Sequence, residues 1–218
     1  MNLAAKDIAQ YLKDHPDFFN QYADALAQIT VPDPHGGRAV SITERQMGTL
    51  RDQVKRLEAK LAELIRFGEE NDALLAKTHR LVLALAGAPD TGTVLRVLYA
   101  HLGGDFAVPH VAVRLWGVAG DPGAPEFTPM SEEAREFAAS IKRPYCGTGS
   151  GPDVLAWFGE RGMQVRSLAL VTLRRGQDVF GLLALGSEEP QRFYPEMGTL
   201  YLERIGEVAA TALARTLR

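Results

Sequence analysis

The sequence has almost no cysteine, and this scarcity excludes several kinds of site. Its 218 residues contain one cysteine, Cys146. An intramolecular disulfide needs two cysteines, and a thiolate-based zinc site needs more than one. The five histidines show no H-E-x-x-H or comparable spacing, so we predict no metal site. A single thiol suits a reducing compartment, and we expect the protein to be cytoplasmic.

Neither sign of charge dominates, and no long hydrophobic run is present. Lys and Arg number 24 against 27 Asp and Glu, a formal net charge of −3 at pH 7. Binding to a phosphate backbone needs a basic field, so we expect no nucleic-acid partner. The longest uninterrupted apolar run, from Leu81 to Ala86, is far below the roughly 18 residues that suggest a membrane span. We therefore expect no membrane attachment, and the first residues show no signal-peptide pattern.

The remaining composition, 46% hydrophobic and 23% charged, suits one globular domain with additional structure attached. We divide the chain into an N-terminal helical pair at 1–40, a long helix at 41–86 and a globular domain at 87–218. A cluster of Pro and Gly at 31–37 separates the first two parts.

Residues 1–40 are predicted to form two short helices. Pro16 ends the first, because its ring disfavours helical geometry in the residue before it. The second is expected from Asp17 to Ile29, where apolar residues recur at three- and four-residue steps. Two helices of this size cannot bury such an apolar face alone. We therefore expect them to dock elsewhere on the protein or on a partner protein.

Residues 41–86 carry a heptad pattern. Ser41-Ile-Thr-Glu44 is a capping-box sequence, which predicts a helix start. From Met47 to Leu85 the seam positions follow at alternating steps of three and four, and most of them are apolar. This spacing predicts a coiled coil and a homodimer. The positions expected to form its interface are Leu50, Val54, Leu57, Leu61, Leu64, Leu75 and Val82.

Several residues leave the arrangement of this helix open. Gly68, Asn71 and Thr78 occupy seam positions, where they weaken packing, while Ile65 and Phe67 widen the apolar stripe. A two-stranded coiled coil, a four-helix arrangement and a long helix lying along its own domain are all compatible with this pattern.

The globular part is predicted to begin with a helix, a strand and a second helix. Asp90 and Ser131 can each cap a helix with a side-chain oxygen. Between them, residues 108–116 alternate in polarity and predict a half-buried strand. Residues 144–152 are rich in Gly and Pro, and we expect a loop there.

The last part is predicted to be a hairpin followed by a helix. Residues 167–173 and 179–185 are almost continuously apolar, which indicates strands covered on both faces. The polar turn between them contains Gly176. An amphipathic helix follows to the end of the chain.

Several segments together carry a resemblance to known proteins. The hairpin with Gly176, the motif Arg192-Phe-Tyr-Pro195 and the long final helix resemble the closing half of a GAF domain. A wider set of motifs is similar to the bacterial family catalogued as domain of unknown function number 484. That set consists of Tyr11–Phe19, Ser41–Gln46, Pro144–Gly147, Leu185–Ser187 and Arg192–Thr199.

This resemblance implies an α+β fold, in which a GAF-like antiparallel sheet is flanked by helices and preceded by a helical region. The family has no assigned activity, and the resemblance identifies no cofactor. GAF relatives bind cyclic nucleotides, tetrapyrroles, amino acids or other small molecules, or only dimerise.

Candidate ligand-binding residues follow from the segments that face the cavity in GAF relatives. They are Trp116, Phe127, Tyr145, Cys146, Trp157, Phe158 and Arg166. Ordinary core packing is the competing interpretation for each aromatic residue. Arg114, Arg143 and Arg166 are candidates for positive charge in such a pocket, with surface exposure as the alternative.

No catalytic constellation is present, so we expect a protein that is not an enzyme. Cys146 precedes a glycine-rich stretch, which permits a lowered thiol pKa and redox chemistry, but there is no second cysteine to act as a resolving partner. A small buried residue is the simpler interpretation of Cys146. The glycines at 147–151 lack the lysine of a phosphate-binding loop and leave only a weak anion-nest hypothesis.

Three functional hypotheses follow from the sequence. The first is a regulatory sensor or adaptor in signalling, which dimerises through the long helix and binds a small molecule in the GAF-like pocket. The second is a structural dimerisation or protein-interaction module without a ligand. The third is a redox enzyme that acts through Cys146.

Overall fold

A computed structural model describes residues 4–24, 29–31, 40–148 and 154–217. The chain separates into two compact units, Met1–Glu69 and Glu70–Arg218. The boundary lies inside the long helix, because the last turns of that helix pack into the core of the second unit. The two units are described separately below.

The first unit begins with two short helices, α1 (Ala5–Asp14) and α2 (Phe18–Gln21). The prediction of a single helix from Asp17 to Ile29 is wrong. At Tyr22 the backbone leaves the helical region, with φ −120° and ψ 37°, and residues 23 and 24 are helical again. Phe, Asn and Tyr have weaker helix propensities than Ala or Leu, so this segment favours a long helix only slightly. No residue of α1 or α2 is buried.

The long helix is α4 (Ile42–Ala86), which contains 45 residues and confirms the helix predicted at 41–86. A two-residue antiparallel ladder precedes it, formed by β1 (Thr30–Val31) and β2 (Val40–Ser41). Strands of two residues leave no periodic pattern in a sequence, so they cannot be predicted from it.

The second unit is built on a four-stranded antiparallel sheet in the order β3-β6-β5-β4. Its strands are β3 (His110–Leu115), β4 (Tyr145–Gly147), β5 (Ser167–Arg175) and β6 (Asp178–Ser187). The predicted hairpin is β5 and β6, paired from Ser167↔Ser187 to Arg175↔Asp178. Gly176 closes its turn with φ 64°, a conformation that most residues with a side chain avoid.

Two expectations about the strands are wrong. The segment 144–152 was expected to be a loop, but Tyr145–Gly147 form the edge strand β4, which pairs with Leu168–Leu170 of β5. Strand β3 is buried on both faces rather than on one, because helices cover both sides of the sheet.

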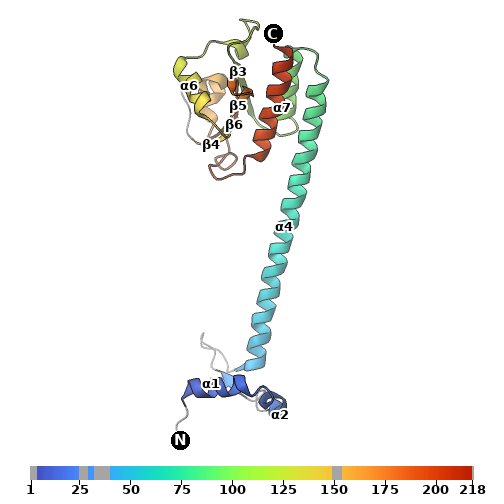
Figure 1. Cartoon of the computed structure of the whole chain (residues 1–218), viewed down its shortest axis with the longest axis vertical. Helices are drawn as coiled ribbons and strands as arrows, with labels where there is room; N and C mark the ends of the chain where they lie inside the picture. The colour runs from blue at the N-terminus through green and yellow to red at the C-terminus, as the bar shows by residue number, and fades with distance from the viewer. Residues whose placement is uncertain (1–3, 25–28, 32–39, 149–153, 218) are drawn as a thin grey trace. The chain divides into compact units, whose positions relative to one another are not determined.

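Two helical layers cover the sheet (Figure 1). One face packs against α5 (Thr91–Gly103), α7 (Leu200–Thr216) and the last turns of α4, in one hydrophobic cluster. The other face packs against α6 (Glu132–Ser140) and the 3₁₀ segment η2 (Val154–Gln164), in a second cluster. The predicted fold class, an antiparallel sheet flanked by helices and preceded by a long helix, is confirmed.

Local capping fixes where two of these helices begin. The Asp90 carboxylate accepts a hydrogen bond from the Thr93 backbone N–H at 2.8 Å, and the Ser131 hydroxyl accepts one from Ala134 N–H at 3.2 Å. Both side chains satisfy backbone donors that the first turn of a helix leaves free.

Among the described residues, no helix combines the length and apolar content that crossing a bilayer requires.

Candidate functional site

The most unusual side chain in the second unit is Arg114, which lies on β3. Only 9% of its surface is exposed, although arginine is rarely buried without a partner. Its Nη1 donates a hydrogen bond to the Val113 carbonyl oxygen at 3.0 Å. Its guanidinium carbon lies 5.1 Å from the ring centroid of Trp157, a cation–π contact. Burial lowers the pKa of Arg114, but an arginine remains charged at neutral pH.

A cavity of about 260 Å³ opens beside this guanidinium. Arg114 lies on the sheet side, Trp157 and Ala156 come from η2, and the remaining wall comes from the segment that leads into α6. The full lining is Arg114, Thr128, Pro129, Met130, Ser131, Ala134, Ala156 and Trp157. The cavity therefore combines one buried cation and two hydroxyl groups with the side chains of Pro129, Met130, Ala134, Ala156 and Trp157.

Ser131 reaches this cavity because it is the N-cap of α6. Its oxygen already accepts the hydrogen bond from Ala134 N–H, which leaves the hydroxyl hydrogen as a donor. Among the bonds of the described residues, none uses that hydrogen. Ser131 therefore caps the N-terminus of α6 and also supplies a hydrogen-bond donor in the lining of the cavity.

A buried acid lies near Arg114 without pairing with it. The Glu126 carboxylate is 8% exposed and accepts a hydrogen bond from the Tyr99 hydroxyl at 2.8 Å. Burial first, and then this hydrogen bond, raise the pKa of Tyr99. Within the described residues, no ion pair of 4.0 Å or less joins Arg114 to a carboxylate. Glu126 nevertheless acts on Arg114 through space, since its charge favours the protonated guanidinium.

Tyr99 borders a second cavity, of about 460 Å³, together with Glu126 and Phe127 of the segment η1 (Pro125–Phe127). Arg96 and Phe127 also line it. A third cavity of about 250 Å³ is lined by Trp116, Phe127 and Arg135, among others. Residues of β3 thus line two of these cavities, Arg114 the first and Leu115 the third.

The structure distributes the predicted ligand-binding residues over several places. Trp157 lines the Arg114 cavity, Trp116 and Phe127 line the third one, and Phe127 also lines the second. Tyr145 and Phe158 pack against the cluster beneath α6, while Cys146 is buried in the opposite cluster. Arg166 is exposed. Sequence reasoning named Arg114 only as one of three candidate arginines and missed Thr128 and Met130, whose position depends on tertiary packing.

Cys146 lies in the middle of β4 and is buried. Burial raises the pKa of its thiol to about 11. A reactive cysteine needs the opposite shift, which a helix N-terminus or a nearby cation supplies.

The glycine-rich stretch 147–151 falls largely outside the described residues, so the anion-nest hypothesis stays a prediction. No group of three metal-binding side chains occurs among the residues that the structure describes.

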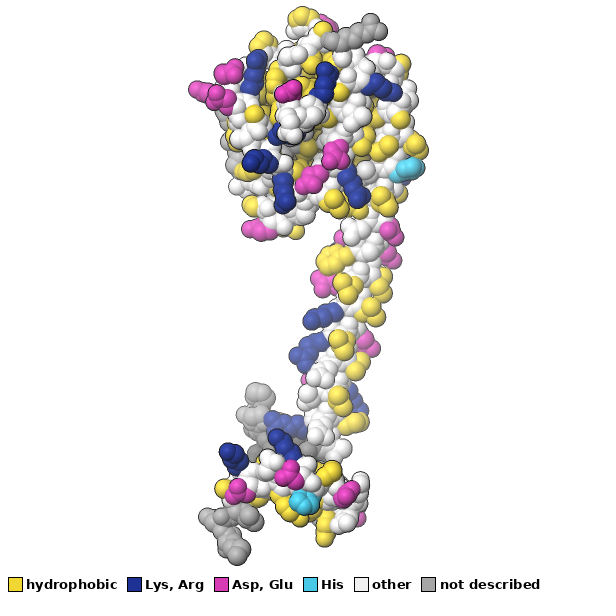
Figure 2. All heavy atoms as spheres, viewed as in Figure 1, with side chains coloured by type: hydrophobic (Ala, Val, Ile, Leu, Met, Phe, Trp, Pro, Cys, Tyr) yellow, Lys and Arg dark blue, Asp and Glu magenta, His cyan; other side chains and the backbone are white. Residues whose placement is uncertain are grey.

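The predicted heptad seam divides into an exposed and a covered part. Figure 2 shows apolar side chains along one side of α4. Six of the predicted interface residues expose 51–65% of their surface: Leu50, Val54, Leu57, Leu61, Leu64 and Leu75. Nearer the end of α4, the seam residues Thr78 and Leu85 are buried by the chain's own domain, and Val82 is partly buried.

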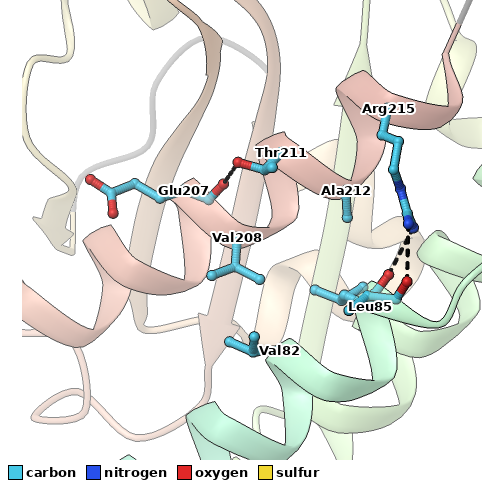
Figure 3. Close-up of a pocket in the computed structure, with 8 residues that line it drawn as sticks. Val82, Leu85, Glu207, Val208, Thr211, Ala212 and Arg215 are labelled. Atoms are coloured by element: carbon cyan, nitrogen blue, oxygen red, sulfur yellow. Dashed lines mark hydrogen bonds between the residues drawn. The ribbon is translucent and has the colours of Figure 1, made fainter.

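Val82 and Leu85 also line a groove of about 470 Å³ between α4 and α7 (Figure 3). Val208 and Ala212 form its opposite wall. At one end, Arg215 donates hydrogen bonds to the carbonyl oxygens of Leu85, Ala86 and Ala88 at 3.0, 3.0 and 2.7 Å. This guanidinium ties the carboxyl end of α4 to α7.

Comparison with known proteins identifies the family. Residues 1–217 match the family described as "Protein of unknown function, DUF484", and the chain belongs to it. Similar proteins include the "Uncharacterized protein YigA" of Salmonella typhimurium strain LT2, which is 26% identical over 97% of this chain and 91% of that protein. The protein of the same name from Escherichia coli K12 is 25% identical over 95% of this chain and 90% of its own length.

Two solved structures show some likeness in fold. One is the GAF domain of the potassium sensor histidine kinase KdpD from Escherichia coli, with a TM-score of 0.35 and 17% identity over 64% of this chain and 92% of that domain. The other is the chromophore-binding domain of the bacteriophytochrome RpBphP3 from R. palustris, with a TM-score of 0.40 and 11% identity over 65% of this chain and 60% of the other. These scores give no information on what this chain binds.

Proposed function

We propose that this protein is a non-enzymatic regulatory sensor or adaptor, which forms a homodimer through α4 and binds a small molecule in its GAF-like domain. The exposed heptad stripe on α4 is the observation that carries this proposal. Leu57 and Leu64 each expose 65% of their surface. Burying such a side chain contributes about 1.5–3 kcal/mol, so pairing of two helices along the stripe is strongly favourable.

The connection between α4 and the sheet supports a regulatory role. α7 packs on β5, and Arg215 of α7 binds the last carbonyl groups of α4. A ligand that moves the sheet relative to α7 would thereby shift the end of α4. In a paired helix such a shift biases register or pairing, which a partner protein can detect. The exposed apolar faces of α1 and α2 are the proposed docking surface for that partner.

Measurement of the oligomeric state in solution tests the proposed homodimer. We expect sedimentation velocity to show a dimer for the wild-type chain and a dimerisation constant weakened at least about 100-fold in Leu57→Asp, because an unpaired carboxylate would enter an apolar seam. Ala59→Asp is the matched control. It places the same charge on the opposite side of the same helical turn and should leave the dimer intact. A monomeric wild-type chain, or equal effects of both substitutions, would contradict the proposal.

A purely structural dimerisation module is the second candidate. The packing of Tyr145 and Phe158 into the core favours it, because these residues then fill space rather than line a cavity. Calorimetric titration with small molecules distinguishes the two candidates, since only the sensor binds one. Redox catalysis through Cys146 is disfavoured by its raised pKa.

A further inference from the structure

We infer that the cavity at Arg114 binds a small organic monocarboxylate, with the carboxylate on the guanidinium and an apolar body against the remaining wall. This inference deepens the proposed sensor function by giving the chemical class of its ligand. It rests on the placement of Arg114, on the size and lining of the cavity, and on the charges around it.

The first step is the hydrogen bonding of Arg114. A guanidinium carries five N–H donors. Arg114 uses one of them, because Nη1 donates to the Val113 carbonyl oxygen. The Trp157 ring contacts the guanidinium by a cation–π interaction, which uses none of its N–H donors. Because Arg114 is nine-tenths buried and lines the cavity, its remaining donors are available to a molecule in that cavity. A planar carboxylate matches this donor geometry in a bidentate pair.

The second step is size. A water molecule occupies about 30 Å³ in the liquid, so a cavity of about 260 Å³ holds a molecule of roughly ten non-hydrogen atoms. Nucleotides and tetrapyrroles are much larger than this. Pro129, Met130 and Ala134 supply apolar surface for the body of such a molecule, while the hydroxyl of Ser131 can donate to a second polar atom.

The third step is charge. Arg114 is the one cation in the lining of this cavity. Glu126 lies near enough for its charge to act on Arg114. That negative charge disfavours a doubly charged phosphate more than a singly charged carboxylate. We therefore expect the cavity to prefer a monoanion.

The test is isothermal titration calorimetry of the full-length protein with pairs of small acids and their neutral amides, such as benzoate with benzamide and isovalerate with isovaleramide. Inorganic phosphate is titrated separately. We expect at least one acid to bind at least about tenfold more tightly than its amide, because a hydrogen bond to a charged group contributes about 1.5–3 kcal/mol. Tighter binding of phosphate than of every acid, or no difference within the pairs, would overturn the inference.

Variants locate the site. Arg114→Gln should weaken binding of the preferred acid at least about tenfold, and Ser131→Gly should weaken it by a smaller factor while keeping most of the helix cap. Arg96→Gln is the control, because Arg96 lines the neighbouring cavity next to Glu126. If Arg96→Gln abolishes binding and Arg114→Gln does not, the inference is wrong. Should Arg114→Gln fail to fold, Arg114→Lys and Ser131→Gly give the same comparison.

Failure of this inference can be distinguished from failure of the proposed function. Leu57→Asp should break the dimer without changing the affinity for the acid, since Leu57 lies outside the second unit. If no acid binds while the wild-type chain is dimeric, the ligand class is wrong and the dimer stands.

Discussion

The guanidinium of Arg215 in α7 lies 3.0 Å from the carbonyl oxygen of Leu85 in the last turn of α4. The same side chain also binds the carbonyl groups of Ala86 and Ala88. The last carbonyl groups of a helix have no partners within the helix and carry partial negative charge, so a cation at this position satisfies both needs. Arg215 thus joins the carboxyl end of the long helix to α7, alongside the Tyr201 hydroxyl, which donates to the Asn71 carbonyl oxygen at 3.1 Å, and the Arg80–Asp105 ion pair at 3.5 Å.

The first prediction concerns this connection. Arg215→Ala should lower the free energy of unfolding of the second unit by roughly 1–3 kcal/mol. The substitution removes the charge-assisted hydrogen bonds to the carbonyl groups at and just after the carboxyl end of α4. Urea denaturation followed by circular dichroism measures the change. Arg204→Ala is the control, since Arg204 is also exposed on α7 but only contacts the ring of Tyr201, at 5.8 Å. Equal losses in the two variants would contradict the role assigned to Arg215.

Elements with a local signal could be predicted from the sequence. Asp90 and Ser131 cap their helices as expected, and the hairpin around Gly176 forms as its apolar strands indicated. The long helix α4 begins at Ile42, where the sequence Ser41–Glu44 predicted a helix start. In each case the cause lies within a few residues of its effect, so a reading of the chain alone detects it.

Elements that depend on distant partners could not be predicted. The three residues of β4 are a strand only because Leu168–Leu170 lie beside them, and their own glycine-rich surroundings indicated a loop. The candidate site also depends on residues that are distant in the sequence. Arg114 becomes a buried cation only when Trp157, far along the chain, covers it. The sequence could name Arg114 as a candidate, but only folding removes it from solvent.

The second prediction concerns close packing between α7 and the sheet. A Cβ atom at Gly206 would lie 2.4 Å from Cγ1 of Val171, a distance that forces a shift. Gly206→Ala should therefore destabilise the second unit by about 1–3 kcal/mol, reduced by the better helix propensity of alanine. Gly198→Ala is the control, because nothing lies within 4 Å of a Cβ at that position. Thermal denaturation of both variants compares them, and a Gly206→Ala protein as stable as the wild type would show that α7 can move away from β5 without cost.

The last prediction concerns Cys146 and pH. Burial raises the pKa of its thiol to about 11, whereas an unfolded cysteine titrates near its ordinary value of about 8.5. The folded state therefore favours the protonated thiol, and this contribution to stability is present below pH 8.5 and is lost as the pH rises towards 11. At pH 8 about 0.1% of the folded thiol is ionised, against roughly a quarter of the unfolded one.

Alkylation with iodoacetamide measures this difference, because only the thiolate reacts. At pH 8 the native protein should be labelled at least about 100-fold more slowly than the protein in urea, and labelling of the native protein should accelerate as the pH rises. Cys146→Ser provides the background rate without a thiol. A native rate close to the unfolded one would mean that the thiolate is accessible, and redox chemistry at Cys146 would then return as a candidate function. A slow native rate leaves Cys146 as a packing residue of β4 and counts against redox catalysis through this thiol.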